Sequence, residues 1–163
     1  MSMASLEELR AELVSLTELQ RVLGWKIARD WPPRLWEADP IRWAIGKIEA
    51  EPEELFWRPW YVRMRGYDGA YCATAGFKGP AQDGMLEVGY SVVDSHHRRG
   101  IATEVTGMLM EWARDFAGIS KFCAHTLVGD PASAGVLLKN GFVMAGTVVD
   151  PVDGEIARFE RCS

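Results

Sequence analysis

The chain lacks any apolar run long enough to enter or cross a membrane. Its N-terminus is a polar, charged helical pattern and has no apolar secretory segment. Cysteine is also scarce: three widely spaced residues, an odd number, are poor material for a disulfide framework. We therefore expect a soluble, unprocessed, cytoplasmic protein that has no membrane partner.

An excess of basic residues is missing as well. The formal net charge is −5 and the pI is near 5.2, which disfavours a broad nucleic-acid surface and a small basic RNA-binding module. The cluster from His96 to Arg99 is then a local basic spot that suits a discrete anionic ligand. At 163 residues, with 48% hydrophobic residues and no internal repeat or linker, the chain predicts one globular domain.

Metal ligands are few. Cys123 and His125 are two residues apart in a predicted strand and therefore share one face, where a thiol and an imidazole could bind a metal ion together. No further ligands follow at a suitable spacing, so we favour ordinary strand residues and expect no metal site.

The most informative segment joins a strand pattern to a helix pattern. Residues 85–93 alternate, with the apolar residues on one face and Glu87, Gly89 and Ser91 on the other. After Gly100 the apolar positions recur at helical spacing as far as Phe116. The sequence therefore predicts a strand, a short basic turn and a helix.

The turn before this helix could hold an anion. A helix N-terminus has unpaired N–H groups and the positive end of the helix dipole, and Gly100 lets another group approach the backbone. A pyrophosphate would fit there. The alternative is an ordinary strand-turn-helix unit in which Arg98 and Arg99 are solvated turn charges.

Other patterns predict the remaining elements. Ser5 and Ser15 each begin a Ser-x-x-Glu capping box, which indicates two short helices, or one bent helix, ending near Gly24. Asp39 and Pro40 indicate the start of a further helix that runs to about Glu51. The other predicted elements are strands at 60–64, 71–77 and 121–127, a helix from Asp130-Pro131 to Asn140-Gly141, and strands at 142–149 and 155–161 around a turn at Asp153-Gly154.

An ordered set of three motifs resembles a known family. The motifs are Glu87-Val-Gly-Tyr90 followed by Arg98-Arg-Gly-Ile-Ala-Thr-Glu104, then Asp130-Pro-Ala-Ser133, then Lys139-Asn-Gly-Phe142. The chain resembles the GCN5-related N-acetyltransferases (GNAT), and within them the subgroup that includes the ribosomal-protein N-terminal acetyltransferases. The resemblance covers roughly residues 57–161.

The resemblance implies an α/β (α+β) fold in which helices flank a mixed, mostly antiparallel twisted sheet. One N-acetyltransferase domain would span residues 1–163, with a helical, Trp-rich acceptor side at 1–56 and an acetyl-CoA-binding sheet core at 57–161. The implied reaction is direct acetyl transfer from acetyl-CoA, a co-substrate, to a primary amine of a small molecule or a protein N-terminus. A homodimer is an allowed assembly. The alternative is a non-catalytic acyl-CoA-binding or sensor domain.

The resemblance also implies a donor site. In the family the central strand splays from its neighbour, and its free backbone groups bind the co-substrate; here Gly89 to Val93 would supply them, with Gly89 as a bulge or a point of close approach. His97 stands where the family has another residue, and Asp130 replaces an asparagine. The implied cofactor-binding residues are Ser91, Val92, Val93, His97, Arg98, Arg99, Gly100, Ile101, Ala102, Asp130 and Ser133.

Two residues are candidates for proton transfer. Glu87 would be the base, because family members commonly use a carboxylate on this strand; otherwise it is a solvated strand residue. Leu137 stands where many members have a tyrosine acid. Ser133 matches the serine that has that role in the resembled subgroup, and its alternative reading is a first-turn helix residue without chemistry.

The acceptor side is less well defined. Six of the seven tryptophans lie between Trp25 and Trp60, where they could line an acceptor pocket or pack the N-terminal helices onto the sheet. Asp30, Glu37 and Asp39 would favour a cationic amine, unless they are only surface charges.

Overall fold

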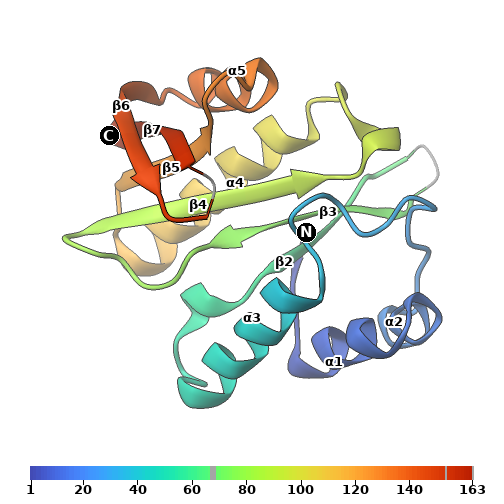
Figure 1. Cartoon of the computed structure of the whole chain (residues 1–163). Coiled ribbons are helices and arrows are strands. Elements are labelled where there is room, and N and C mark those ends of the chain that lie inside the picture. Colours follow the sequence, from blue (N-terminus) through green and yellow to red (C-terminus); the bar gives the residue numbers. More distant parts are fainter. Residues whose placement is uncertain (67–68, 153, 163) are drawn as a thin grey trace.

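A single twisted sheet organises the computed structural model, which describes residues 1–66, 69–152 and 154–162. In these residues the sheet has seven strands in the order β1-β2-β3-β4-β5-β7-β6 (Figure 1). Neighbouring strands are antiparallel except for the parallel pair β4 and β5, which confirms the mixed, mostly antiparallel prediction. The strands are β1 (Ser2–Met3), β2 (Trp60–Arg63), β3 (Tyr71–Phe77), β4 (Met85–Val92), β5 (Lys121–Leu127), β6 (Val143–Asp150) and β7 (Gly154–Cys162).

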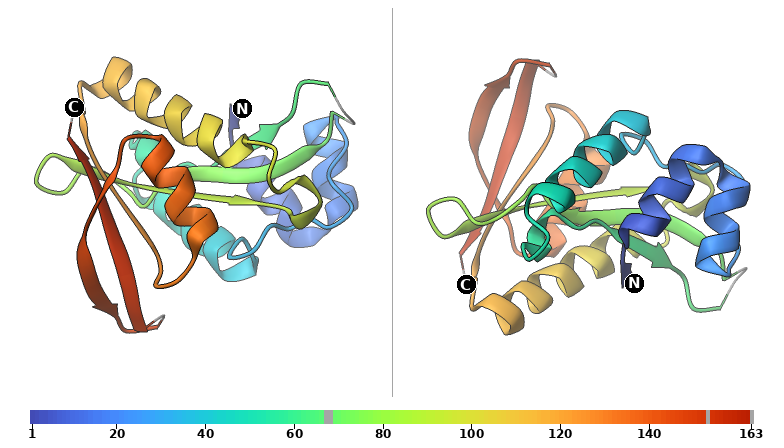
Figure 2. Two further views of the ribbon diagram at one scale, coloured as in Figure 1. Left: turned by 90° about the horizontal axis from the view of Figure 1, so that it is seen from above. Right: turned by 90° about the horizontal axis from the view of Figure 1, so that it is seen from below.

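Helices cover both faces of this sheet. Figure 2 shows α4 on one side of β2–β4, and α1, α2 and α3 on the other. α5 packs against α4 and β5. The helices are α1 (Leu6–Val14), α2 (Leu16–Leu23), α3 (Ala38–Ala50), α4 (Ile101–Ala117) and α5 (Pro131–Lys139). No helix in the described part of the chain is long and apolar enough to span a bilayer.

The two faces of β4 have different neighbours. Leu86 and Val88 are buried on the side of α4, where this helix places its apolar stripe. Tyr61 lies opposite Thr74, and Thr74 opposite Ser91, so these three side chains share the other face. That face lies under α1 and carries the alternate β4 positions that include Glu87.

Local sequence signals explain how α1 and α2 begin and end. Ser5 and Glu8 form the complete capping box at the start of α1. Ser15 ends α1 and accepts a hydrogen bond from Glu18 N at the start of α2, while Gly24 ends α2 in a left-handed conformation. Of the two arrangements that the sequence allowed, the structure has two separate helices.

Two predicted details differ from the structure. The helix expected after Asp39 begins earlier, at Ala38, and Asp39 pairs with Arg42 in its first turn instead of capping it. The bulge at Gly89 is wrong, because β3 and β4 pair from Ala73↔Val92 to Phe77↔Val88 without a shift. Asp153 of the predicted turn lies outside the described residues.

Candidate functional site

β4 and β5 separate after a short paired stretch. Their parallel pairing joins residues 85–87 to residues 121–123, and the described residues contain no further pair between these two strands. We call the opening between Val88–Val92 and Ala124–Leu127 the fork. The structure thus has the splay that the family resemblance implied.

One edge of β4 faces β3 and the other faces the fork. Val93 N donates to Cys72 O of β3 over 2.9 Å, and Lys78 N donates to Glu87 O over 3.0 Å. Backbone groups alternate in direction along a strand, so the odd-numbered residues of β4 turn their N–H and C=O groups toward β3.

The even-numbered residues of β4 therefore turn their backbone groups into the fork. The backbone groups of Ser91 and Val93, for which co-substrate contacts were expected, therefore face β3, and those of Tyr90 and Val92 face the fork. The co-substrate contacts themselves remain a prediction. Val92 O already accepts a hydrogen bond from His97 Nε2 over 2.8 Å. The His97 ring points back along β4, so its contribution to an anion site would come from its backbone.

The start of α4 has unpaired donors. Gly100 is the N-cap residue, with a left-handed φ of 80° and no side-chain cap, and Arg98 is left-handed as well, with a φ of 60°. The first backbone bond of the helix runs from Glu104 N to Gly100 O over 3.0 Å, which leaves the N–H groups of the first turn available. A Cβ added to Gly100 would meet nothing within 4 Å. This open, donor-rich turn suits a phosphate.

The start of α5 lies across the fork from β4. Asp130 Oδ1 accepts hydrogen bonds from the N–H groups of Ala132 and Ser133, both over 3.0 Å, which confirms the predicted cap. Leu137 is fully buried. The predicted acid Ser133 therefore lies in the first turn of a well-capped helix.

Tyr90 supplies a phenol that the motif comparison did not single out. Its hydroxyl lies 3.1 Å from Ser133 O and 3.0 Å from Ser133 Oγ. Burial, with a smaller effect of the Asp130 charge, raises the pKa of Tyr90 above its ordinary value, so the phenol keeps its proton at neutral pH. The sequence pattern had assigned Tyr90 only to the apolar face of the strand.

The predicted base has a partner on β5. Glu87 Oε1 lies 3.0 Å from His125 Nδ1, and the two side chains are 32% and 20% exposed. Burial raises the pKa of the neighbouring Cys123 thiol, and the charge of Glu87 adds to the effect, so this cysteine is a thiol at neutral pH. No group of three metal-ligating side chains occurs among the described residues.

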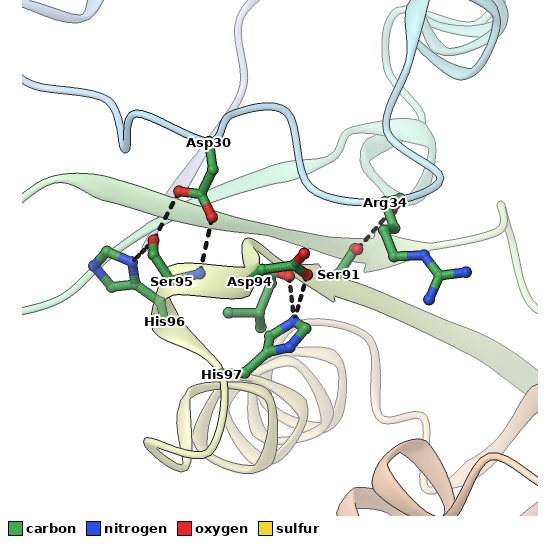
Figure 3. Close-up of polar contacts among 8 residues, drawn as sticks. Asp30, Arg34, Ser91, Asp94, Ser95, His96 and His97 are labelled. Carbon is green, nitrogen blue, oxygen red and sulfur yellow. Dashed lines mark hydrogen bonds and ion pairs between the residues drawn. The ribbon is translucent and has the colours of Figure 1, made fainter.

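An irregular segment between α2 and α3, residues 25–37, crosses the end of β4. We call it the strap. Asp30 accepts from Ser95 N over 2.8 Å and from Ser95 Oγ over 2.7 Å (Figure 3). Ser95 lies just before the turn that ends at Gly100, which we call the anion turn. Ser91 Oγ donates to Arg34 O over 2.6 Å. The strap is thereby fastened to the strand and the turn that form the donor side.

A buried carboxylate fastens the other side of the strap to α1. Glu12 Oε1 accepts from Trp31 Nε1 over 2.6 Å, and both carboxylate oxygens lie 3.2 Å from Trp36 Nε1. The Tyr61 hydroxyl of β2 also donates to Glu12. Burial raises the pKa of Glu12, although the three donors act in the opposite direction. Trp31 and Trp36 thus pack the N-terminal region onto the sheet, one of the two roles that the sequence allowed.

The acidic residues of the acceptor side are already partly engaged. Asp30 is bound by Ser95, and Asp39 forms an exposed ion pair with Arg42 over 2.8 Å. Glu37 precedes α3 without a side-chain cap bond. Their use in recognising a cationic amine remains a prediction.

Comparison with known proteins gives a consistent picture. The family model described as Acetyltransferase (GNAT) domain matches residues 3–143. Two curated proteins of Bacillus subtilis (strain 168), the uncharacterized N-acetyltransferases YjdG and YoaA, are each 33% identical to the chain, over 70 and 76 residues. These alignments cover 42% and 46% of this chain, and 42% and 43% of the relatives' own lengths.

Solved structures share the fold at low sequence identity. A chimera of the Vibrio cholerae spermidine N-acetyltransferase SpeG and hSSAT (K23-Q34) superposes with a TM-score of 0.67 at 13% identity, covering 99% of this chain and 94% of that one. Ribosomal-protein-S5-alanine acetyltransferase from Vibrio fischeri has a TM-score of 0.60 at 14% identity, covering 82% and 78%.

Proposed function

The chain belongs to the GNAT acetyltransferase family, and we propose that it transfers an acetyl group from acetyl-CoA directly to a primary amine of a small molecule or a protein N-terminus. The observation that carries this proposal is the fork beside the open N-terminus of α4. The two features together offer backbone groups to an extended thioester arm and N–H donors to a pyrophosphate. Residues 97–102 would hold the phosphates and Tyr90 and Val92 the arm.

The side chains around the fork fit direct transfer. Glu87 supplies the carboxylate of the base, on the sheet face that also carries Ser91, which is bound by the strap. Ser133, whose Oγ adjoins the protonated Tyr90 phenol, is the proton source for the departing thiolate. Cys123 is disfavoured as an acetyl-carrying nucleophile, because its raised pKa keeps the thiol protonated.

Calorimetry and a thiol-release assay test the proposal. We expect the purified protein to bind acetyl-CoA and to release free CoA when it is given amines such as spermidine, lysine and an alanine-initiated peptide. Glu87→Gln and Ser133→Ala should lower the rate while acetyl-CoA binding is kept. Absence of CoA binding would contradict the donor site.

A non-catalytic acyl-CoA-binding domain is the second candidate. The departures from the family pattern at His97, Asp130 and Leu137 motivate it. Binding of acetyl-CoA without turnover of any amine would favour this candidate over the enzyme.

A further inference from the structure

Glu87 and His125 meet where the fork begins. Glu87 is the last β4 residue in the parallel ladder and lies opposite Cys123. Side chains two residues apart share a face, so His125 is the next β5 residue on the side of Glu87. Both side chains thus lie on the α1 side, at the point where the strands separate.

The contact favours one arrangement of the ring proton. His125 Nδ1 lies 3.0 Å from Glu87 Oε1, an ion-pair distance, and a carboxylate beside Nδ1 favours a hydrogen on that nitrogen over a lone pair. Nε2 of a neutral ring then has the free lone pair. Across the described residues, Nε2 has no hydrogen bond to another side chain or to the backbone.

Neighbouring charges leave this pair intact. Arg158 of β7 lies opposite His125 in the ladder, but its Nε donates to Glu160 Oε1 over 2.8 Å and its Nη2 contacts Met85 Sδ. The Arg158 charge is therefore balanced by Glu160. From the β3 side, Lys78 approaches β4, with its Cε 3.6 Å from the position of a Cβ on Gly89.

We propose that His125 Nε2 receives the proton of the acceptor amine and that Glu87 holds the ring and stabilises the imidazolium. An imidazole is ordinarily a stronger base than a carboxylate by about two pKa units, which suits it better to an amine. This inference rests on the proposed function and makes Glu87 one half of the base.

The proposed step balances atoms and electrons. The amine lone pair forms the C–N bond with the acetyl carbon, the C–S bond breaks, and its electron pair leaves with sulfur. One proton passes from nitrogen to His125 Nε2, and one reaches sulfur from the side of Ser133 and Tyr90. Water then carries the proton from the imidazolium back to that hydroxyl pair, so a neutral amine gives no net proton release.

The ranking of two conservative variants separates this dyad from a lone carboxylate. If His125 takes the proton, His125→Gln should lower kcat by about 100-fold or more, and Glu87→Gln, whose amide oxygen can still accept from Nδ1–H, by only about 10-fold. If Glu87 acts alone, the order reverses. Lys121→Gln, on the same strand and face, is the matched control and should keep the wild-type kcat.

Chemical rescue gives a readout that a purely structural role would not change. Imidazole in the buffer should raise the rate of His125→Ala by about 10-fold and should leave the rate of Ser133→Ala unchanged. Acetyl-CoA should bind all variants with the wild-type Kd. A His125→Gln rate within 3-fold of wild type, or no rescue, would overturn the dyad but not the proposed acetyltransferase function. If wild type turned over none of the amines named above, the proposed function would fail, and the dyad with it.

Discussion

The anion turn before α4 and the strap differ in what holds them. The turn relies on backbone: two left-handed residues, an uncapped helix start and an open space beside Gly100. The strap has no regular helix or strand. Backbone bonds to Tyr71 hold its first residues, and side chains hold the rest, with Glu12 on one side and Ser95 on the other. We therefore expect the donor side to tolerate changes of residue type better than the strap.

We therefore expect departures from the family pattern to matter little at the turn. His97 replaces the usual residue, yet its ring is used by Val92 O and the N–H donors of the first turn remain. On the strap side, removing one acceptor would leave several donors without a partner.

The largest effect is expected at Glu12. Glu12→Ala would leave Trp31 Nε1, Trp36 Nε1 and the Tyr61 hydroxyl without their acceptor in a buried site. We expect a loss of about 3 kcal/mol in the free energy of unfolding, measured by urea denaturation. Glu7→Ala, an exposed position of α1, should change it by less than about 0.5 kcal/mol. A loss as small at Glu12 would show that the strap is held by other contacts.

Glu12 also predicts a pH dependence. Burial raises the folded-state pKa of Glu12 above the unfolded value, so the folded state binds more protons between these two values. The stability that this group contributes is therefore fully present below the ordinary glutamate pKa and falls as the pH rises through the raised one. Because Glu12→Gln does not titrate there, the free energy of unfolding of wild type minus that of Glu12→Gln should fall as the pH rises above the ordinary glutamate pKa. A flat difference would contradict the raised pKa.

At the turn, strain and ligand binding can be separated with the two glycines that cap α4. Gly100 and Gly118 are both left-handed, with φ of 80° and 66°, and neither would place a Cβ within 4 Å of another group. Valine at either position should destabilise the fold by about 1–2 kcal/mol. Only Gly100→Val should weaken acetyl-CoA binding, by about 100-fold in calorimetry, because it disturbs the N–H donors. Equal Kd values for the two variants would show that the pyrophosphate does not bind at this turn.

The donor side could be predicted from the sequence because its signals are local. Alternation in β4, the glycine at the turn and the Asp130 cap each act over a few residues, and the strands at 71–77 and 121–127 have the predicted bounds. The resemblance added the splay, which no local pattern shows.

The features of the site that could not be predicted from the sequence depend on contacts between distant segments. Glu12 meets Trp31 and Tyr61 across 19 and 49 residues, and Tyr90 meets Ser133 across 43. Period-two alternation assigned Tyr90 to the apolar face without showing that its hydroxyl reaches α5. From the sequence, His125 was only a residue on the same strand face as Cys123, for which ordinary strand residues were favoured over a metal pair.

An effect of intermediate size on kcat is expected at Tyr90. Tyr90→Phe keeps the ring in place but removes the hydroxyl beside Ser133 Oγ. If the pair protonates the leaving thiolate, kcat should fall by about 10-fold with the Kd of acetyl-CoA unchanged. Because the two hydroxyls act together, adding Ser133→Ala should cost little more. Multiplied losses in the double variant would mean that the hydroxyls act independently.

The smallest effect is expected at Asp30, which joins the strap to the turn. Although partial burial acts in the opposite direction, the hydrogen bonds from Ser95 N–H and Oγ–H hold the pKa of Asp30 below its ordinary value. Its contribution is therefore present above the unfolded aspartate pKa and is lost as the pH falls through the lower folded one. Since Asp30 is exposed and screened by water, Asp30→Asn should cost only about 1 kcal/mol at neutral pH, and less in acid, by urea denaturation. Asp115→Asn at the exposed end of α4 is the control, and an acetyl-CoA Kd within about 3-fold of wild type in Asp30→Asn would show that the turn keeps its geometry without the strap.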